Sequence, residues 1–453
     1  MSRSSKETME PLTALIVGAG IGGLSAAIFL RHQGHKVLVF ERSKFSAEVG
    51  AAIHVAPNCQ RLLTRMGIST TDHGGTPLER VINLSCRNYI APDVDLTLTS
   101  YLLESSPWEM SATLPLTQVI EKAGANWDLI HRADLHSALR NRALSREGAG
   151  SPVQLFLNTR IIDMDVQNAT LTLAGGDVAT GDLVIGADGA HSWTRAFVAP
   201  ESQPQFPWGK CCFRWLVPYE ELNEKFQCDN RNTLIEWTGP DRRIICYPCS
   251  NHSIANFGAF VPSTEVTTSN REWNNRASKE QLLQCFEKFD PSIRQILNQV
   301  PEDGLKIWEL FDMQNLPSWA NDCSALLGDA AHPFLPFMAQ GGAMAIEDGA
   351  SIGALFPLGT SRADIPSRLQ MYEQCRKDRV ERIQDFTRRS GRNNDGSEGP
   401  RPKGNYLIEI LCSWLYLTGI HFIGEEVASF LPFCIDHDEW ENSSRFLAEQ
   451  THY

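Results

Sequence analysis

Apolar runs and a helical segment alternate near the start of the chain. Residues 12–17 (LTALIV) are an apolar run typical of a buried strand, and residues 36–40 (KVLVF) are a second run of this kind. Between them, residues 24–30 (LSAAIFL) indicate a helix that ends near Gly34. A strand, a helix and a second strand in this order predict a βαβ unit with a parallel sheet.

The pattern farther along predicts a mixed α/β protein. Helical periodicity marks residues 61–66, 134–143, 367–390 and a segment from about 346. Strand-like runs lie at residues 154–157, 160–162, 171–173 and 183–185. Residues from about 205 to 310 are aromatic-rich and mostly extended, with few helical segments. No internal repeat interrupts this order.

The turn of the first βαβ unit contains glycines at positions where a side chain would be in the way. Gly18 allows the tight turn out of the strand, Gly20 allows a pyrophosphate to approach the backbone, and Gly23 allows the helix to pack on the sheet. Glu41 ends the second strand, 21 residues after Gly20, where an acidic residue can accept hydrogen bonds from ribose hydroxyls. The segments 186–189 (GADG) and 328–333 (GDAAHP) are two further places where backbone can approach a dinucleotide.

The length and net charge of the chain limit the number of domains and the kinds of partner that can be expected. At 453 residues the chain is long enough for two or three domains of about 150 residues and can bury a large cofactor. The formal net charge of −13 argues against nucleic acid or an acidic membrane as the main partner.

Cysteines and the chain ends indicate a cytoplasmic protein with reduced thiols. The 12 cysteines show no repeating framework. Cys246 and Cys249 form a Cys-x-x-Cys that could be half a zinc site or a redox pair, but it lies in a predicted strand and has no second half, so we predict no metal site. The polar start of the chain does not resemble a secretory leader.

The C-terminal part contains a polar stretch and then an apolar one. Residues 391–404 (GRNNDGSEGPRPKG) predict a loop or linker. The apolar stretch Tyr406 to Gly424 is interrupted by Glu409, Gly419 and His421, so we expect a packed helix pair and no firm membrane anchor, with loose membrane contact as the alternative.

Six motifs, taken together and in this order, resemble a single-component FAD-dependent aromatic hydroxylase, the class typified by para-hydroxybenzoate and salicylate hydroxylases and including hydroxylases of fungal secondary metabolism. They are residues 18–27 (GAGIGGLSAA), 40–42 (FER), 50–58 (GAAIHVAPN), 131–135 (HRADL), 182–195 (DLVIGADGAHSWTR) and 328–349 (GDAAHPFLPFMAQGGAMAIEDG). The chain departs from the usual Gly-Ala-Gly of the family at Ala52, which related members also carry.

The resemblance implies FAD as the cofactor and NADPH or NADH as the reductant. It assigns Gly18, Gly20 and Gly23 to the adenosine-diphosphate half of FAD and Glu41 to its ribose. Gly50 and Ala52 would allow a close approach of the backbone to the cofactor, and Arg132 would contact it from the start of a helix. Asp188 would lie near the pyrophosphate and the nicotinamide path, Asp329 at the ribityl chain, and Gly341 and Gly342 at the flavin. Asp188 with Gly189 is also an ordinary turn pair, and Arg132 could be a surface cation.

The resemblance also implies a substrate domain whose strands supply an arginine and a tyrosine. Arg214 in residues 213–218 (FRWLVP) would stabilise a phenolate, and Tyr247 in residues 245–248 (ICYP) would orient it. Alternatively, Arg214 is a salt-bridged sheet residue and Tyr247 a core aromatic.

Other polar and aromatic candidates surround these two residues. His54 and His332 could each relay a proton or simply bond to backbone. Four aromatic residues could form a cage around the substrate or belong to the core: Phe213, Trp215, Phe334 and Phe337.

The implied fold is a Rossmann-like FAD-binding domain interleaved with an antiparallel β-sheet substrate domain, followed by C-terminal helices. The expected division is FAD-binding at 11–80, 126–200 and 316–390, substrate-binding at 81–125 and 201–315, a linker at 391–404, and a helical region at 405–453.

The implied activity is an NAD(P)H- and O2-dependent monooxygenation. A flavin 4a-hydroperoxide would hydroxylate or epoxidise an electron-rich aromatic, such as a phenol, a polyketide or an indole alkaloid. A salicylate-type decarboxylating hydroxylase, an FAD-dependent oxidase or dehydrogenase, and a non-catalytic FAD-binding protein remain alternatives. A flavin halogenase is disfavoured because its Trp-x-Trp-x-Ile-Pro stretch is absent.

Overall fold

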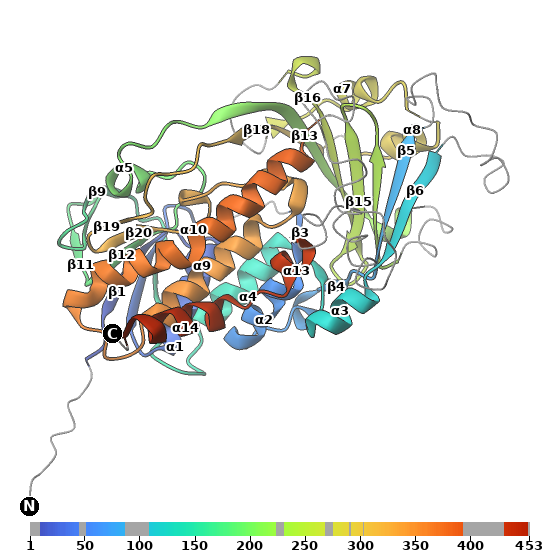
Figure 1. Cartoon of the computed structure of the whole chain (residues 1–453). Coiled ribbons are helices and arrows are strands. Elements are labelled where there is room, and N and C mark those ends of the chain that lie inside the picture. The colour runs from blue at the N-terminus through green and yellow to red at the C-terminus, as the bar shows by residue number, and fades with distance from the viewer. Residues whose placement is uncertain are drawn as a thin grey trace, which may run out of the picture.

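The computed structural model shows two lobes, one built on a parallel sheet with helices and one on a large, mostly antiparallel sheet (Figure 1). The residues that it describes are 10–44, 51–86, 108–222, 231–267, 275–289, 291–301, 303–392 and 430–451. The predicted mixed α/β fold with C-terminal helices is confirmed.

The first lobe contains a six-stranded sheet assembled from distant segments. Its spatial order is β19 (Ala320–Asn321), β20 (Ser324–Leu326), β12 (Leu183–Gly186), β1 (Thr13–Val17), β2 (Lys36–Phe40) and β8 (Gln154–Phe156). All neighbours pair in parallel except β19 and β20. The strands are rich in Val, Ile, Leu and Ala because both faces of such a sheet are covered.

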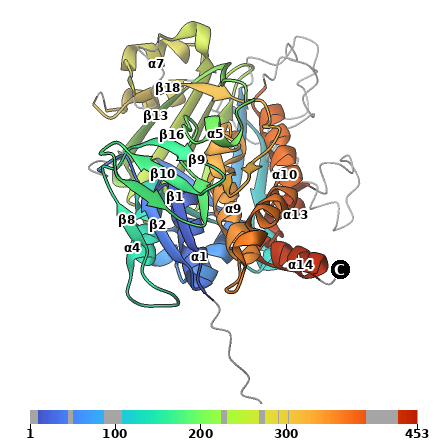
Figure 2. The ribbon, with the colours of Figure 1, turned by 90° about the vertical axis from the view of Figure 1, so that its left-hand side faces the viewer.

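Helices pack against this sheet (Figure 2). The larger ones are α1 (Ile21–His32), α2 (Pro57–Met66), α4 (Arg132–Leu144), α9 (Gly341–Leu355) and α10 (Ile365–Ser390). Helix α1 packs between α4 and α9, and nearly all of its residues are buried. The predicted helices at 24–30, 61–66, 134–143 and 367–390 therefore exist, with α9 beginning at Gly341, before the position near 346 where periodicity became visible.

The second lobe is an eight-stranded sheet drawn from two separate parts of the chain. Its spatial order is β17 (Asn275–Arg276), β18 (Lys306–Asp312), β13 (Phe206–Pro218), β16 (Ile254–Pro262), β15 (Arg243–Cys249), β14 (Thr233–Thr238), β5 (Arg80–Cys86) and β6 (Trp108–Pro115). One pair, β14 with β5, is parallel. One face of the sheet packs on α7 (Lys279–Cys285) and α8 (Pro291–Asn298) through a core of its own.

Smaller elements complete the described chain. Two three-stranded sheets join β3 (Ala52–Val55), β7 (Asp128–His131) and β4 (Thr76–Pro77), and β11 (Val178–Thr180), β10 (Thr170–Leu173) and β9 (Ile161–Asp165). The short helices are α3 (Thr117–Ala123) and α5 (Arg195–Val198), with 3₁₀ turns η1 (Thr71–His73), η3 (Tyr219–Glu221), η4 (Ser263–Glu265), η5 (Gly328–Ala330), η6 (Pro336–Met338) and η7 (Arg362–Asp364).

The described C-terminal residues form α13 (Phe430–Ile435) and α14 (Glu439–Thr451), and α14 packs on α9 and α10. Most of the predicted linker 391–404 and the apolar stretch Tyr406 to Gly424 lie outside the described residues. Among the helices that are described, none has the length and apolar character needed to cross a bilayer.

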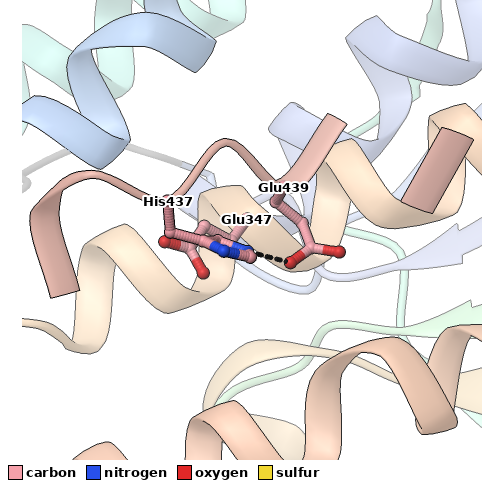
Figure 3. Close-up of side chains that lie close together, drawn as sticks. All are labelled: Glu347, His437 and Glu439. Atoms are coloured by element: carbon pink, nitrogen blue, oxygen red, sulfur yellow. Dashed lines mark hydrogen bonds and ion pairs between the residues drawn. The ribbon is translucent and has the colours of Figure 1, made fainter. Parts of the chain in front are cut away.

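A buried ionic cluster joins α14 to α9 and α10. Figure 3 shows Glu347 of α9 beside His437 and Glu439, and the His437 imidazole lies 2.6 Å from a Glu439 carboxylate oxygen. Arg376 of α10 donates to Glu347 and Glu439, each at 2.7 Å, and to Asp348 at 2.8 Å. All three carboxylates and Arg376 are fully buried.

Two arginines supply the positive charge of this cluster. Arg379 also contacts both oxygens of Glu347, at 2.8 Å each. Burial alone would raise the pKa of the Glu347 carboxyl, but Arg379 and Arg376 outweigh it and hold that pKa below its ordinary range. Although Glu347, His437 and Glu439 place potential ligand atoms within 4.8 Å of one another, guanidinium groups already bind these carboxylates. The cluster is therefore an ion-pair network that holds α14 against the first lobe.

We expect Arg376→Met to lower the free energy of unfolding by about 3–5 kcal/mol, because it leaves buried carboxylates without their shared cation. Urea denaturation followed by circular dichroism measures this loss. The control is Asp385→Asn, which breaks an exposed pair with Arg389 on the same helix and should cost less than about 0.5 kcal/mol. Equal losses in the two variants would show that the cluster adds no stability of its own.

Candidate functional site

A cavity of about 340 Å³ lies between the two lobes. The first lobe lines it with the β1–α1 turn, the η5 segment and the beginnings of α4 and α9. The second lobe lines it with one face of β13, β15, β16 and β18. The volume lies in the range of pockets that bind small molecules and cofactors, roughly 300–1,000 Å³.

The glycines of the first turn have the geometry that their spacing predicts. Gly18 has a φ of +104°, in the region that favours glycine. A Cβ at Gly23 would lie 2.1 Å from the carbonyl oxygen of Gly18, so a larger residue would separate the helix from the turn. At Gly20, which lines the cavity, a Cβ would meet no protein atom within 4 Å. Its missing side chain therefore leaves room for a ligand, next to the uncapped N-terminus of α1.

Glu41 lies beside this turn with both carboxylate oxygens bonded to backbone. It accepts hydrogen bonds from the Ala19 amide at 2.9 Å and the Ser43 amide at 2.7 Å. It does not line the cavity, so its role with a ribose stays a prediction. Gly50, another predicted cofactor-binding residue, lies outside the described residues.

Strand pairing places Ala52 and Arg132 at the cavity. Ala52 is opposite His131 in the antiparallel pair β3–β7, and the Arg132 amide donates to the Ala51 carbonyl at 2.9 Å. Arg132 then begins α4 and lines the cavity, as the motif predicts, and does not lie on a distant surface.

Asp188 holds its own loop together. Its carboxylate accepts hydrogen bonds from the amides of Trp193 and Thr194 and from the hydroxyls of Ser192 and Thr194, at 2.6–3.0 Å. Ala187 and Gly189 line the cavity on either side of it, whereas Asp188 does not. Any effect of Asp188 on a ligand would act through the shape of this loop.

Asp329, in the η5 segment, is exposed and lines the cavity. The surrounding protein raises the pKa of its carboxyl by desolvation, and His332, Arg132 and Arg195 oppose this rise. Arg195 was missed by the sequence reasoning, although it ends the motif 182–195. It donates to the carbonyls of Asp329 at 2.9 Å and Ala330 at 2.8 Å, and so fixes the η5 segment on the first lobe.

The N-terminus of α9 faces the cavity through Gly341 and Gly342. No side chain caps this 15-residue helix. Its free amides and its dipole therefore favour negative charge at this point of the cavity.

Arg214 and Tyr247 lie in the second lobe's wall of the cavity, and both donate to one backbone atom of β3. The Tyr247 hydroxyl donates to the Ala52 carbonyl at 2.9 Å, and an Arg214 Nη donates to the same oxygen at 3.3 Å. Burial raises the pKa of Tyr247 above its ordinary value, and the nearby Arg214 opposes this rise. Asn256, which sequence reasoning missed, accepts from the Ala52 amide at 3.2 Å.

The predicted aromatic cage is only partly present. Phe334 lines the cavity, and Phe337 lines a smaller one beside it. Phe213 and Trp215 instead lie in the core on the opposite face, where Trp215 stacks on Phe257. Side chains alternate along a strand, so the neighbours of Arg214 must face away from it. Trp308 of β18 takes their place, with the Arg214 guanidinium 5.5 Å from its ring centre.

The two candidate histidines have different surroundings. His54 is buried between the rings of Tyr247 and Trp127, its Nδ1 has no hydrogen-bond partner, and burial lowers its pKa to about 4. His332 bonds to Asp348 of the ionic cluster at 2.6 Å and does not line the cavity.

Comparison with known proteins agrees with this geometry. A family model described as an FAD binding domain matches residues 12–387. A hispidin-3-hydroxylase of Neonothopanus nambi is 36% identical over 386 residues, which cover 82% of this chain and 86% of the relative. Among solved structures, CtdE in complex with FAD and substrate aligns with a TM-score of 0.76 at 18% identity, covering 98% of this chain and all of that chain. A salicylate hydroxylase substrate complex aligns with a TM-score of 0.73 at 21% identity, covering 96% and 98%.

We expect Gly20→Ala to weaken FAD binding at least tenfold while leaving the free energy of unfolding of the FAD-free protein unchanged or slightly higher. The added methyl group meets no protein atom and belongs to a residue that lines the cavity, so it would occupy space that a bound cofactor needs. Quenching of FAD fluorescence gives the dissociation constant. Gly175→Ala is the control, because a Cβ there is equally free of contacts but does not touch the cavity. Unchanged FAD affinity in Gly20→Ala would refute the assignment of this turn.

Proposed function

The chain belongs to the family of FAD-dependent monooxygenases that share this FAD-binding domain, and on that premise we propose that it uses NAD(P)H and O2 to hydroxylate or epoxidise an electron-rich aromatic substrate. The observation that supports this most directly is the convergence of Arg214 and Tyr247 on the cavity wall of the second lobe. The uncapped end of α9 enters the same cavity from the first lobe.

The described residues fit FAD. Gly20 leaves an open path along the backbone, and Arg132 and Asp329 line the same side of the cavity. We propose that Gly18, Gly20, Gly23, Arg132, Asp329 and Gly342 hold the cofactor, that Glu41 binds its ribose and Asp188 shapes the neighbouring loop. When bound, FAD supplies the redox chemistry that takes a hydride from NAD(P)H and activates oxygen.

The substrate's reacting ring would lie against the second lobe. Arg214 would bind its phenolate oxygen, since a fixed guanidinium favours the anion and raises the electron density of the ring. Tyr247, whose raised pKa keeps its hydroxyl protonated at neutral pH, would hydrogen-bond and orient the same oxygen. Both donors now share the Ala52 carbonyl, so a substrate oxygen would compete for groups that are already aligned.

The cavity wall would also limit access of water. Phe334, Trp308 and Ile245 line it, and apolar side chains at these positions reduce the number of polar contacts that water could make. This exclusion would protect activated oxygen from discharge without product.

We also propose a reducing, cytosol-like compartment and the domain division given by the sequence. The cysteines among the described residues are all free, and most are buried. The parallel-sheet strands and the large-sheet strands alternate along the chain, which is the arrangement expected of interleaved domains.

The direct test is consumption of NADPH and NADH by the purified yellow protein with a panel of phenols, salicylates, indoles and hispidin, with hydrogen peroxide followed in parallel. Hispidin belongs to this panel because the relative from Neonothopanus nambi is named for it. We expect substrate-stimulated consumption, little peroxide and a product heavier by one oxygen. Loss of carbon dioxide from a salicylate would establish the decarboxylating variant, and flavin reduction by an added compound without nicotinamide would replace the proposal with an oxidase or dehydrogenase.

We expect Arg214→Met to reduce kcat/KM about 100- to 1,000-fold, because the substrate oxygen loses the guanidinium that the proposal places beside it. Tyr247→Phe should reduce it about 10- to 100-fold through the loss of one oriented hydrogen bond. Steady-state kinetics on the best substrate of the panel gives both values. Tyr219→Phe is the matched control, since Tyr219 is buried in the same lobe but does not line the cavity. An effect of Tyr219→Phe as large as that of Tyr247→Phe would contradict the assignment.

A further inference from the structure

A second, smaller cavity of about 40 Å³ adjoins the main one. The two share five lining residues, so they lie on two sides of the same side chains: His54, Ile245, Phe260, Pro336 and Ala339. The smaller cavity, called the side cavity below, has room for two or three water-sized groups, because one water needs roughly 10–15 Å³. It can take a substituent but not a second ring.

A buried ion pair forms part of the side cavity's wall. Glu236 of β14 and Arg243 of β15 are 3% and 8% exposed, and their side chains pair at 3.2 Å. Arg243 also donates to the Ser390 carbonyl at 2.6 Å and lies over the Phe337 ring at 5.0 Å. Burial of two charges costs several kcal/mol per ion, which an apolar pair of similar volume would avoid. Such a pair in a cavity wall therefore indicates a polar function there.

His54 lies at the junction of the two cavities and has an unpartnered ring nitrogen. It lines both of them, is 8% exposed, and its Nδ1 has no hydrogen-bond partner. A buried polar atom without a partner has lost its hydrogen bonds to water and has gained none within the protein. A ligand that bonds to it would therefore gain affinity.

Strand register sets the distance between the side cavity and Arg214. Arg214 is opposite Gly258, Gly258 is opposite Ile245, and Ile245 is opposite Glu236. These four residues form one row across four strands and face the same side of the sheet. Three strand spacings separate Arg214 from Glu236, or roughly 14 Å between their backbones, since neighbouring strands lie about 4.8 Å apart. Gly258 contributes no side chain to the floor between them.

We infer that the side cavity is a distal subsite that binds a hydroxyl group at the far end of an elongated aromatic substrate, whose reacting ring is held by Arg214. This inference rests on the proposed function and extends it to a substrate class. Glu236 and Arg243 neutralise each other, so an ionic group would lose hydration without gaining a counter-charge. A hydroxyl can donate to Glu236 and accept from Arg243, and its second lone pair can accept from His54 in the tautomer whose Nδ1 carries the proton.

The test compares two probes that differ by one hydroxyl, 4,4′-dihydroxystilbene and 4-hydroxystilbene. Their dissociation constants come from changes in the visible spectrum of the FAD-loaded protein, without NADPH. We expect the dihydroxy compound to bind at least tenfold more tightly, about the value of one satisfied hydrogen bond. Glu236→Gln should reduce this preference to less than about threefold while changing the affinity for 4-hydroxystilbene by less than about threefold.

Two further variants make the test specific. His54→Leu should also reduce the preference, and it serves if Glu236→Gln fails to bind FAD. Glu265→Gln is the matched control. It removes a glutamate from an ion pair with Arg242, the residue directly before β15, and neither partner lines either cavity, so the preference should be preserved.

Equal binding of the two stilbenes, binding of neither, or a preference that survives both Glu236→Gln and His54→Leu would overturn the inference. None of these outcomes bears on monooxygenation, which NAD(P)H consumption and oxygen incorporation measure separately. Conversely, absence of substrate-stimulated NAD(P)H consumption with a preserved hydroxyl preference would refute the proposed function and leave the subsite in place.

Discussion

Parallel pairing of β1, β12 and β20 is the constraint on which the site depends. The three strands are adjacent in the sheet although they come from residues 13–17, 183–186 and 324–326. Their carboxyl ends share one edge, so the turns that follow them meet there. This is why Gly20, Ala187 and Asp329 line a single cavity. No local interaction could bring these segments together, because each turn is distant in sequence from the other two.

The sequence predicted this edge well and the wall opposite it less well. Glycine spacing after an apolar run constrains backbone geometry directly, and Gly18 and Gly23 have the predicted conformations. Strand alternation excludes Phe213 and Trp215 from the cavity wall once Arg214 is placed there, because neighbouring side chains along a strand point to opposite faces. The bonds of Glu41 and Asp188 to backbone amides could not be predicted, because they depend on how the following loop folds. The ionic cluster around Arg376 could not be predicted either, since its members come from three helices, α9, α10 and α14, with no shared motif.

Ala52 connects the two lobes at the cavity. Its carbonyl accepts from Tyr247 and Arg214, its amide donates to Asn256, and its strand pairs with the one that leads into Arg132. A change in how Tyr247 or Arg214 is bonded would therefore reach the start of α4 through a single short strand. In the proposed site, substrate binding at Arg214 and the position of Arg132 would therefore be mechanically related.

The attachment of α14 has a consequence for how the protein is made. Glu439 of α14 shares Arg376 with Glu347 and Asp348 of α9, the helix whose first turn enters the cavity. During synthesis, α9 and α10 leave the ribosome before residue 439. Their ionic cluster stays incomplete until the Glu439 carboxylate is present. A nascent chain can form the β1–α1 turn early, but the α9 side of the cavity gains its full support only after residue 439 has left the ribosome. The β1–α1 turn and the α9 side of the cavity should therefore mature at different times, the second only after α14 has docked.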